Sequence, residues 1–278
     1  MNKSSFGTNF TVTTWGESHG KALGAVVDGC PAGLSLCEED IQKFLDRRKP
    51  GQSRYTTARK EGDLVEILSG VFEGKTTGTP ISLMVRNTDQ RSRDYGNIAY
   101  SYRPGHADYT FDAKYGFRDY RGGGRSSGRE TIGRVASGAV ASKILNSLGI
   151  TFCTYTKSIG PVSISKFDPE EINNNAFYMP DADAAEKAGA YLEECMKNQD
   201  SAGGVIECRI SGVPAGLGNP VFEKLDAMLA QAVMSVGAVK AVEIGDGTET
   251  ATSKGSSNND GFHMKDGQII KTSNHAGG

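Results

Sequence analysis

Two short segments of the chain each place a histidine in a glycine-framed turn, where it could transfer protons. The sequence holds only four histidines, and two of them, His19 and His106, lie in these segments. Histidine titrates near neutral pH and can act as an acid or a base, while a neighbouring glycine lets the backbone approach a ligand closely. Either ring could instead be packed or capping, and the nearby acids Glu17 and Asp108 could orient the rings or merely cap the turns. The segments are GESHG at 16–20 and RPGHAD at 103–108.

Arginine is unusually dense around these turns. Nine arginines and six carboxylates lie between Arg86 and Arg134, and six basic residues without a carboxylate lie between Arg47 and Lys60. The whole chain nevertheless has a formal net charge of −2, so a general nucleic-acid partner is not expected. Guanidinium groups fork onto phosphate and carboxylate oxygens. Local arginine clusters on a nearly neutral chain therefore predict a small anionic substrate, although any single arginine could be a solvated surface residue.

A third segment, RGGGRSSGRE at 121–130, places a glycine triplet just before a predicted helix. The free N–H groups and the dipole at a helix N-terminus favour an anion. The flanking arginines and the two serines indicate a phosphate site, whereas the triplet alone could be a flexible turn. The segment is neither a Walker loop nor a dinucleotide fingerprint, because it lacks the spacing of both.

The elements that would position these residues are mixed strands and helices without a regular βαβ rhythm, which predicts an α+β fold. A capping box at 35–38 would open a helix that ends with Arg47 and Arg48, before Pro50-Gly51. The stretch 73–79 is a predicted loop, and the polar stretch 246–261 is a mobile loop or lid, or surface disorder. The remaining predicted strands are 10–15, 22–28, 64–72, 80–85, 204–211 and 239–244, and the remaining predicted helices are 129–148, 184–197 and 221–235.

Length and composition fit one domain over residues 1–278. The five scattered cysteines favour a reducing compartment, and their spacing suggests no metal site. No apolar run resembles a signal peptide or reaches membrane-spanning length. We therefore expect a cytoplasmic protein that binds neither a membrane nor a metal.

Eight segments of the sequence together resemble the chorismate synthase family, from about residue 6 to the last residue. Several are long and lie at the spacing that the family shows. They are GESHG at 16–20, DRRKPGQSRYTTAR at 46–59, TDQRSRDY at 88–95, RPGHADYT at 103–110, KYGFRDYRGGGRSSGRET at 114–131, GAVKAVEIGDG at 237–247, GSSNNDGF at 255–262 and SNHAGG at 273–278.

The resemblance implies a layered sandwich of helices between antiparallel β-sheets, usually assembled as a homotetramer. It implies a trans 1,4-elimination of phosphate from 5-enolpyruvylshikimate 3-phosphate, which gives chorismate for aromatic amino-acid biosynthesis. The reaction uses reduced flavin mononucleotide (FMN) without net oxidation or reduction. The reductant is NADPH in members that reduce their own flavin, and other members depend on a separate flavin reductase.

Carried over by motif, the resemblance also implies roles for individual residues. The expected catalytic residues are His19 and His106. The expected substrate-binding residues are Arg48, Arg103 and Arg129. The expected flavin-binding residues are Arg125, Ser126, Ser127, Gly237 and Ala238, and the nicotinamide site is expected at Arg48 and Arg54.

Family sequences continue beyond the SNHAGG motif with a Lys-Pro-Thr-Ser-Ser segment and an Arg-x-Asp motif that complete the site. The given sequence carries neither, so we expect a C-terminally truncated chain that releases phosphate slowly or not at all. The alternatives are a weak or inactive relative that binds flavin or phosphate, a structural subunit of a tetramer with full-length partners, and a self-contained flavin reductase.

Overall fold

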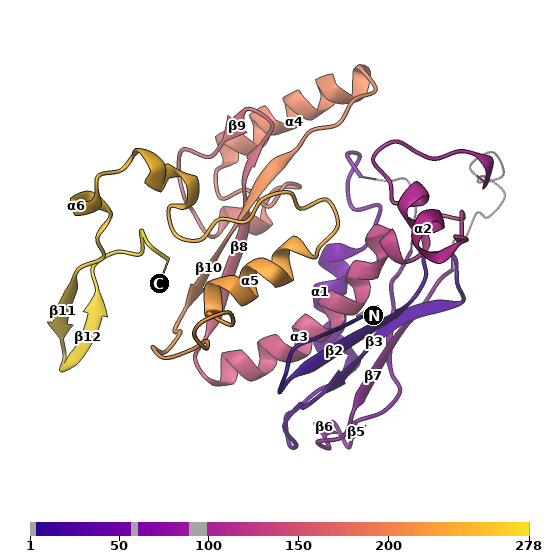
Figure 1. Ribbon diagram of the computed structural model, residues 1–278, viewed down its shortest axis with the longest axis horizontal. Coiled ribbons are helices and arrows are strands. Elements are labelled where there is room, and N and C mark those ends of the chain that lie inside the picture. The colour runs from indigo at the N-terminus through magenta and orange to yellow at the C-terminus, as the bar shows by residue number, and fades with distance from the viewer. Residues whose placement is uncertain (1–3, 57–60, 89–98, 278) are drawn as a thin grey trace. The chain divides into compact units, whose positions relative to one another are not determined.

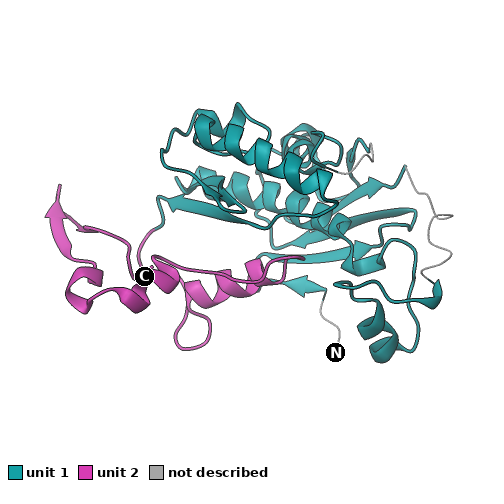
Figure 2. Cartoon of the chain, turned by 90° about the horizontal axis from the view of Figure 1, so that it is seen from above, with its two compact units in different colours: residues 1–213 teal, residues 214–278 magenta. Residues whose placement is uncertain are grey.

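The computed structural model describes residues 4–56, 61–88 and 99–277 (Figure 1). The chain divides into two compact units, Met1–Val213 and Pro214–Gly278, which Figure 2 colours separately. Each unit is described by itself below. The expectation of a single domain stays a prediction.

The first unit is built on a five-stranded sheet in which every neighbouring pair is antiparallel. Most residues of its central strand, β3 (Ala22–Asp28), are buried. Helices cover one face of this strand, and the Trp15 side chain covers the other face at Gly24. The predicted strands 10–15 and 22–28 are confirmed. The predicted pairing of 64–72 with 80–85 is confirmed only for residues 65–67, because residues 71–72 form a separate strand that pairs with residues 75–76. In spatial order the strands are β1 (Ser5–Phe6), β2 (Thr11–Gly16), β3 (Ala22–Asp28), β7 (Ile81–Arg86) and β4 (Val65–Ile67).

Two helices form the layer beside this sheet, α1 (Glu38–Arg48) and α3 (Thr131–Ser147). The sheet and helices share one core, which includes Leu23, Ile41 and Ile132. Helix α3 approaches β3 closely, because a Cβ at Gly133 would lie 2.7 Å from the carbonyl oxygen of Gly24. Both helices follow their predicted ranges. Helix α1 ends at the expected arginines.

A second antiparallel sheet, of strand order β10-β8-β9, belongs to the same unit. Helix α3 contacts β8 as well as β3, so a helix layer lies between two antiparallel sheets and the predicted α+β sandwich is confirmed. The second sheet is β8 (Thr151–Ile159), β9 (Val162–Ser163) and β10 (Gly204–Ser211), with helix α4 (Ala182–Lys197) packed beside it. The unit also holds β5 (Val71–Phe72), β6 (Lys75–Thr76), α2 (Asp108–Tyr115) and the 3₁₀ turns η2 (Gly124–Ser126), η3 (Gly128–Glu130) and η4 (Glu171–Asn173).

The second unit is smaller and is held largely by loops. The Asp260 carboxylate accepts hydrogen bonds from the Ser273 hydroxyl and the His275 N–H, both at 2.7 Å, and these bonds hold its pKa well below the usual range. The elements of this unit are α5 (Leu225–Met234), η5 (Gly247–Thr252), α6 (Gly255–Asn258), β11 (Phe262–Lys265) and β12 (Gln268–Lys271). The predicted loop at 246–261 therefore contains short helical turns.

Three other element predictions are wrong in detail. Helix α1 is capped by Cys37, whose N–H donates to Asp40 at 3.2 Å, and not by Ser35, which forms a bridge with Lys75. The stretch 73–79 is not all loop, because a tight turn after β5 lets β6 pair with it. Residues 239–244 are coil, because a strand needs a ladder partner and none of the described strands pairs with them. Within the described ranges, no helix combines the length and the apolar character that crossing a membrane requires.

Candidate active site

His19 lies in the turn between β2 and β3, and its ring is buried, with 5% of the residue exposed. The Ser18 hydroxyl lies 3.1 Å from His19 Nδ1 and 3.2 Å from the carbonyl oxygen of Gly122. A carbonyl only accepts, so Ser18 donates to Gly122 and accepts from His19. Nδ1 of His19 therefore carries a hydrogen, and Nε2 is the ring nitrogen that carries the acceptor lone pair.

Gly122 is a glycine because its position leaves no room beside the His19 ring. A Cβ there would lie 2.0 Å from His19 Cε1 and 2.1 Å from His19 Nδ1. The backbone φ of Gly122 is +66°, a conformation that also favours glycine. The glycine triplet thus forms one wall of the histidine site. Residue type and spacing do not reveal this contact, because the two residues are about a hundred positions apart.

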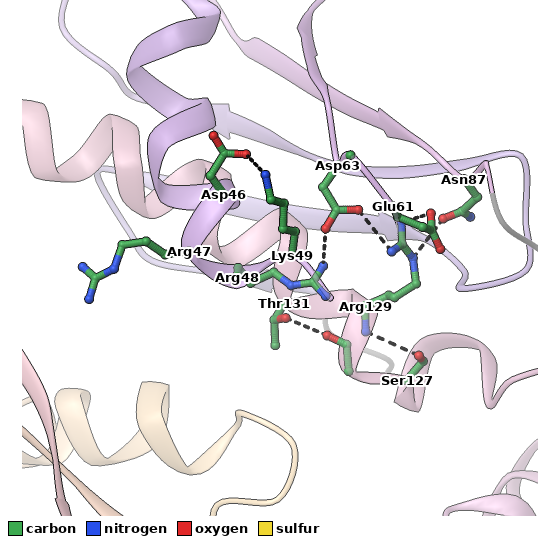
Figure 3. Close-up of polar contacts among 12 residues, drawn as sticks. Asp46, Arg47, Arg48, Lys49, Glu61, Asp63, Asn87, Ser127, Arg129 and Thr131 are labelled. Carbon is green, nitrogen blue, oxygen red and sulfur yellow. Dashed lines mark hydrogen bonds and ion pairs between the residues drawn. The ribbon is translucent and has the colours of Figure 1, made fainter. Parts of the chain in front are cut away.

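Arg129 stands at the centre of a buried ion-pair network, shown in Figure 3. Its Nη1 donates to Asp63 Oδ1 at 3.1 Å, its Nη2 pairs with Glu61 Oε2 at 3.0 Å, and its Nε donates to Asn87 Oδ1 at 3.0 Å. The side chains of all three charged residues are at most 6% exposed. Buried charges are costly unless they are paired. Here Nη1 and Nε of Arg129 are hydrogen-bonded, whereas Nη2 is paired with Glu61 by charge and makes no hydrogen bond within the described residues.

Arg48 joins the same network from the last turn of α1. Its Nη1 donates to Asp63 Oδ2 at 3.0 Å, so one carboxylate bonds two arginines (Figure 3). Burial lowers the pKa of Arg48, and the nearby charge of Asp63 acts in the opposite direction. Arg47 lies beside it in sequence but stacks on the ring of Tyr178 instead, 4.7 Å from the ring centroid.

Asn87 connects this network to the histidine turn. Its carbonyl oxygen accepts from Arg129, and its amide nitrogen donates to the carbonyl oxygens of Glu17 at 3.0 Å and Gly20 at 2.8 Å. The backbone on both sides of His19 is therefore tied to Arg129. Two predicted substrate-binding arginines and one predicted catalytic histidine are brought into one hydrogen-bonded assembly.

The second histidine segment is held by local contacts. His106 is exposed, and its Nδ1 lies 3.0 Å from the carbonyl oxygen of Pro104. Asp108 bonds Arg103 rather than His106 in this structure, with Nε and Nη2 each 2.9 Å from a carboxylate oxygen. These bonds lower the pKa of Asp108 to about 2. Arg103 also lies beside the glycine run, because a Cβ at Gly123 would be 3.6 Å from its Nη2.

The predicted flavin-binding side chains mostly bond backbone groups of the chain. Arg125 donates to the carbonyl oxygens of Gly16 at 3.0 Å and Thr14 at 3.2 Å, and the Ser126 hydroxyl donates to Gly123 at 2.7 Å. Ser127 caps η3 by accepting from the N–H of Arg129. The glycines before them have positive φ angles of 66°, 86° and 53°. A run without side chains that ends at a helix N-terminus suits a phosphate-bearing cofactor.

Three predicted cofactor residues come from other segments of the chain. Arg54 is exposed and pairs with Glu193 on α4 and with the Tyr55 hydroxyl. Gly237 and Ala238 follow α5 in the second unit, where Ala238 adopts a φ of +71°. The arginine-cluster members Arg59, Lys60, Arg91 and Arg93 fall outside the described residues.

Sequence reasoning missed the residues that hold the arginines, which are Glu61, Asp63 and Asn87. Their signal is weak, because each is one polar residue between a strand and an arginine-rich stretch. The only available hint is that carboxylates are scarce where arginines are dense, so each nearby carboxylate is a candidate partner.

Comparison with known proteins identifies the family to which this chain belongs. The chorismate synthase family model matches residues 10–278. The chain belongs to the chorismate synthase family. It is 68% identical over 280 residues to chorismate synthase of Agathobacter rectalis, spanning all of this chain and 76% of that relative. It is 65% identical to chorismate synthase of Lachnoclostridium phytofermentans, of which it spans 77%.

A solved structure supports the same assignment. A crystal structure of chorismate synthase superposes with a TM-score of 0.81 at 34% identity, and the match covers 96% of this chain and 78% of that one. The similarity in fold therefore extends over both units taken in sequence, and the family assignment predicted from the eight motifs is confirmed.

Proposed function

We infer that this chain catalyses the reaction of its family, in which phosphate leaves 5-enolpyruvylshikimate 3-phosphate and chorismate forms. It acts as a carbon–oxygen lyase in aromatic amino-acid biosynthesis. The observation that carries this conclusion is the match of residues 10–278 to the family, with 65–68% identity to two curated chorismate synthases. The arginine-rich assembly around His19 suits a substrate with two carboxylates and a phosphate.

His19 is proposed to assist departure of the phosphate. A phosphate leaves readily only when its growing negative charge is neutralised. Because Nδ1 is bonded to Ser18, Nε2 is the atom that would deliver a proton or a hydrogen bond to the leaving oxygen. The ring is buried, and exclusion of water strengthens such a charge interaction.

Arg48, Arg103 and Arg129 are proposed to bind the anionic groups of the substrate. Arg48 supports this assignment best, since its described contacts occupy only Nη1 and its side chain is 17% exposed. Arg103 is 22% exposed and lies beside the glycine run. Arg129 is more buried, so its contribution would come from a guanidinium already held by its carboxylate partners.

Reduced FMN is proposed as the cofactor, held by Arg125, Ser126 and Ser127, with Gly237 and Ala238 supplying backbone. When bound, it supplies electron density transiently as the C–O bond breaks, so that no net redox change occurs. His106 is proposed to hold the proton that sets the ionisation state of the cofactor. Its exposure leaves the ring accessible to a ligand.

The remaining proposals concern the setting of the enzyme. Arg48 and Arg54 are proposed to bind the nicotinamide nucleotide if this member reduces its own flavin with NADPH, and a separate flavin reductase would otherwise serve it. We propose a homotetramer in the cytoplasm. The five free thiols support a reducing compartment.

The test is phosphate release and chorismate formation under anaerobic conditions with reduced FMN, using the full-length enzyme. We also expect FMN to bind more tightly when substrate is present, since both ligands would share the arginine-lined site. Titration of FMN fluorescence with and without substrate measures this. Equal affinities would exclude a shared site, and ligand binding without phosphate release would favour an inactive flavin- or phosphate-binding relative.

A further inference from the structure

Within the described part of the chain, Asp63 is the carboxylate that hydrogen-bonds two of the proposed substrate-binding arginines. Its side chain is fully buried, with Oδ2 at 3.0 Å from Arg48 Nη1 and Oδ1 at 3.1 Å from Arg129 Nη1 (Figure 3). Arg48 comes from the end of α1 and Arg129 from the turn before α3. A single carboxylate thus joins two guanidinium groups from different elements.

The backbone around Asp63 is shaped for this contact. Asp63 has a φ of +45°, in the left-handed region where Asp and Asn are the best tolerated residues after glycine. Gln42 of α1 anchors the segment, since its amide nitrogen lies 3.3 Å from the Asp63 carbonyl oxygen and its own carbonyl oxygen accepts from the N–H of Val65. The helix that presents Arg48 therefore also fixes the residue that orients Arg48. Such strained positions persist where the surroundings hold them.

We propose that Asp63 is a positioning residue, which holds the forks of Arg48 and Arg129 in the orientation that receives the anionic groups of the substrate. This inference rests on the proposed role of those arginines. Arg129 is further held by Glu61 and Asn87. Among the described residues, the polar partner of Arg48 is Asp63, so Arg48 depends most on this carboxylate. A side chain that is already held in its binding orientation does not lose conformational entropy when the ligand binds, so the ligand binds more tightly.

Two physical effects of Asp63 have opposite signs, which makes the proposal testable. A carboxylate beside an anion site repels the substrate, so if charge alone mattered, removing it would tighten binding. If orientation matters more, removing it weakens binding. Asp63→Asn keeps the size and the tolerated φ, but its amide group turns an N–H toward one of the arginines. Arg48 is then expected to swing away, because Arg129 keeps its other partners.

The first experiment measures the dissociation constant of 5-enolpyruvylshikimate 3-phosphate by titration calorimetry with FMN present. We expect Asp63→Asn to raise it at least tenfold. Glu61→Gln removes the same charge from the Arg129 side of the network and should raise it less. Glu66→Gln alters an exposed ion pair with Arg86 and should leave it unchanged. Binding by Asp63→Asn that is unchanged or tighter would overturn the proposal.

A double-mutant cycle tests whether Asp63 acts through Arg48. Arg48→Ala should weaken substrate binding at least as much as Asp63→Asn, and the two changes together should weaken it little more than Arg48→Ala alone. Additive effects would show that Asp63 acts by another route and would overturn the proposal. Asp63→Glu is a second variant that keeps the charge and the ion pairs but moves the carboxylate by one methylene. If Asp63 acts by orienting the arginines, Asp63→Glu should also weaken substrate binding. If its role is purely electrostatic, Asp63→Glu should leave substrate binding unchanged.

A second measurement needs no substrate and separates this inference from the proposed function. In NMR spectra of arginine-labelled protein, the Arg48 guanidinium should rotate slowly in the wild type and freely in Asp63→Asn, while Arg129 stays restricted. Unchanged rotation of Arg48 would overturn the positioning role. If the wild type does not bind the substrate at all, the proposed function fails, and this spectrum alone decides the inference.

Discussion

The two histidine segments look alike in sequence, yet the fold holds them in different ways. His19 is buried against Gly122, and its Nδ1 is bonded through Ser18 to a carbonyl about a hundred residues away in sequence. His106 is exposed, and its Nδ1 contacts the carbonyl oxygen of Pro104, only two residues earlier. One ring is therefore fixed by tertiary structure and the other by its own turn.

This difference separates two kinds of chemistry. A buried ring with a fixed hydrogen on Nδ1 can present Nε2 in one direction, which suits proton delivery to a defined leaving oxygen. An exposed ring on a local turn can be reached by a ligand that arrives from outside. Changes remote in sequence should accordingly disturb His19, whereas only local changes should disturb His106.

The largest effect should come from removing the buried ring. We expect His19→Ala to lower turnover by roughly a hundred- to ten-thousandfold, as for general acid–base groups in other enzymes. Water cannot easily replace a donor held between Ser18 and Gly122. The measurement is chorismate formation by the full-length enzyme under anaerobic, FMN-saturated conditions. The exposed His263 on β11 supplies the control, since His263→Ala should leave turnover unchanged. Wild-type turnover by His19→Ala would remove its assigned role.

A methyl group on Gly122 should act on His19 from a distance in sequence. In Gly122→Ala the new Cβ would lie 2.0 Å from His19 Cε1, so the ring must move and turnover should fall at least tenfold. Gly105→Ala, in the other histidine turn, is the matched control. Its φ is +72°, close to the +66° of Gly122, but its Cβ would meet nothing within 4 Å. Both variants incur the cost of placing an alanine in a left-handed backbone conformation, roughly 1–2 kcal/mol, and equal losses of turnover would show that the contact with His19 is unimportant.

The same contrast explains what the sequence could reveal. The strands and helices were predictable where one periodic face meets one core, as in the helix around Ile132 and the strand 22–28. The histidines and the arginine-rich segments were recognisable from residue type and motif. The single-sequence prediction of a strand at 239–244 is wrong, because an apolar pattern cannot report whether a ladder partner is present.

The supporting residues were not predictable for a different reason. Gly122, Asn87 and Asp63 act through contacts between segments that are far apart in sequence. Their residue types are ordinary for turns, so type and spacing carry no sign of those contacts. The prediction that Asp108 could orient His106 shows the same limit, since the fold pairs Asp108 with Arg103.

A smaller loss of turnover is expected at the exposed ring. His106→Ala should lower turnover at least tenfold, at the lower end for acid–base groups because solvent can partly replace an exposed donor. The melting temperature should not change, since His106 makes no buried contact in the described structure. Kinetics and thermal unfolding of the same preparation test both statements. A large loss of stability would mean that His106, like His19, is held by tertiary contacts, and the comparison between the two turns would fail.

The smallest effect is expected from the carboxylate of the second turn, and it should depend on pH. Arg103 lowers the pKa of Asp108 to about 2, below its ordinary value of 3.8. A carboxylate with a lowered folded-state pKa contributes stability that is present above the unfolded-state pKa and is lost as the pH falls toward the folded-state value. Asp108→Asn should therefore lower the free energy of unfolding by about 1 kcal/mol near neutral pH. It should also lower turnover by a few fold, because Arg103 is held less firmly.

Urea unfolding of the wild type and of Asp108→Asn measures this difference in the free energy of unfolding. The difference should stay constant down to about pH 4 and shrink below that pH. The exposed pair of Lys166 and Asp183 is the control, because Asp183→Asn should change stability little at any pH. A difference for Asp108→Asn that stays constant below pH 4 would mean that Arg103 does not hold the ionised carboxylate, and that local pairing is not what fixes this turn.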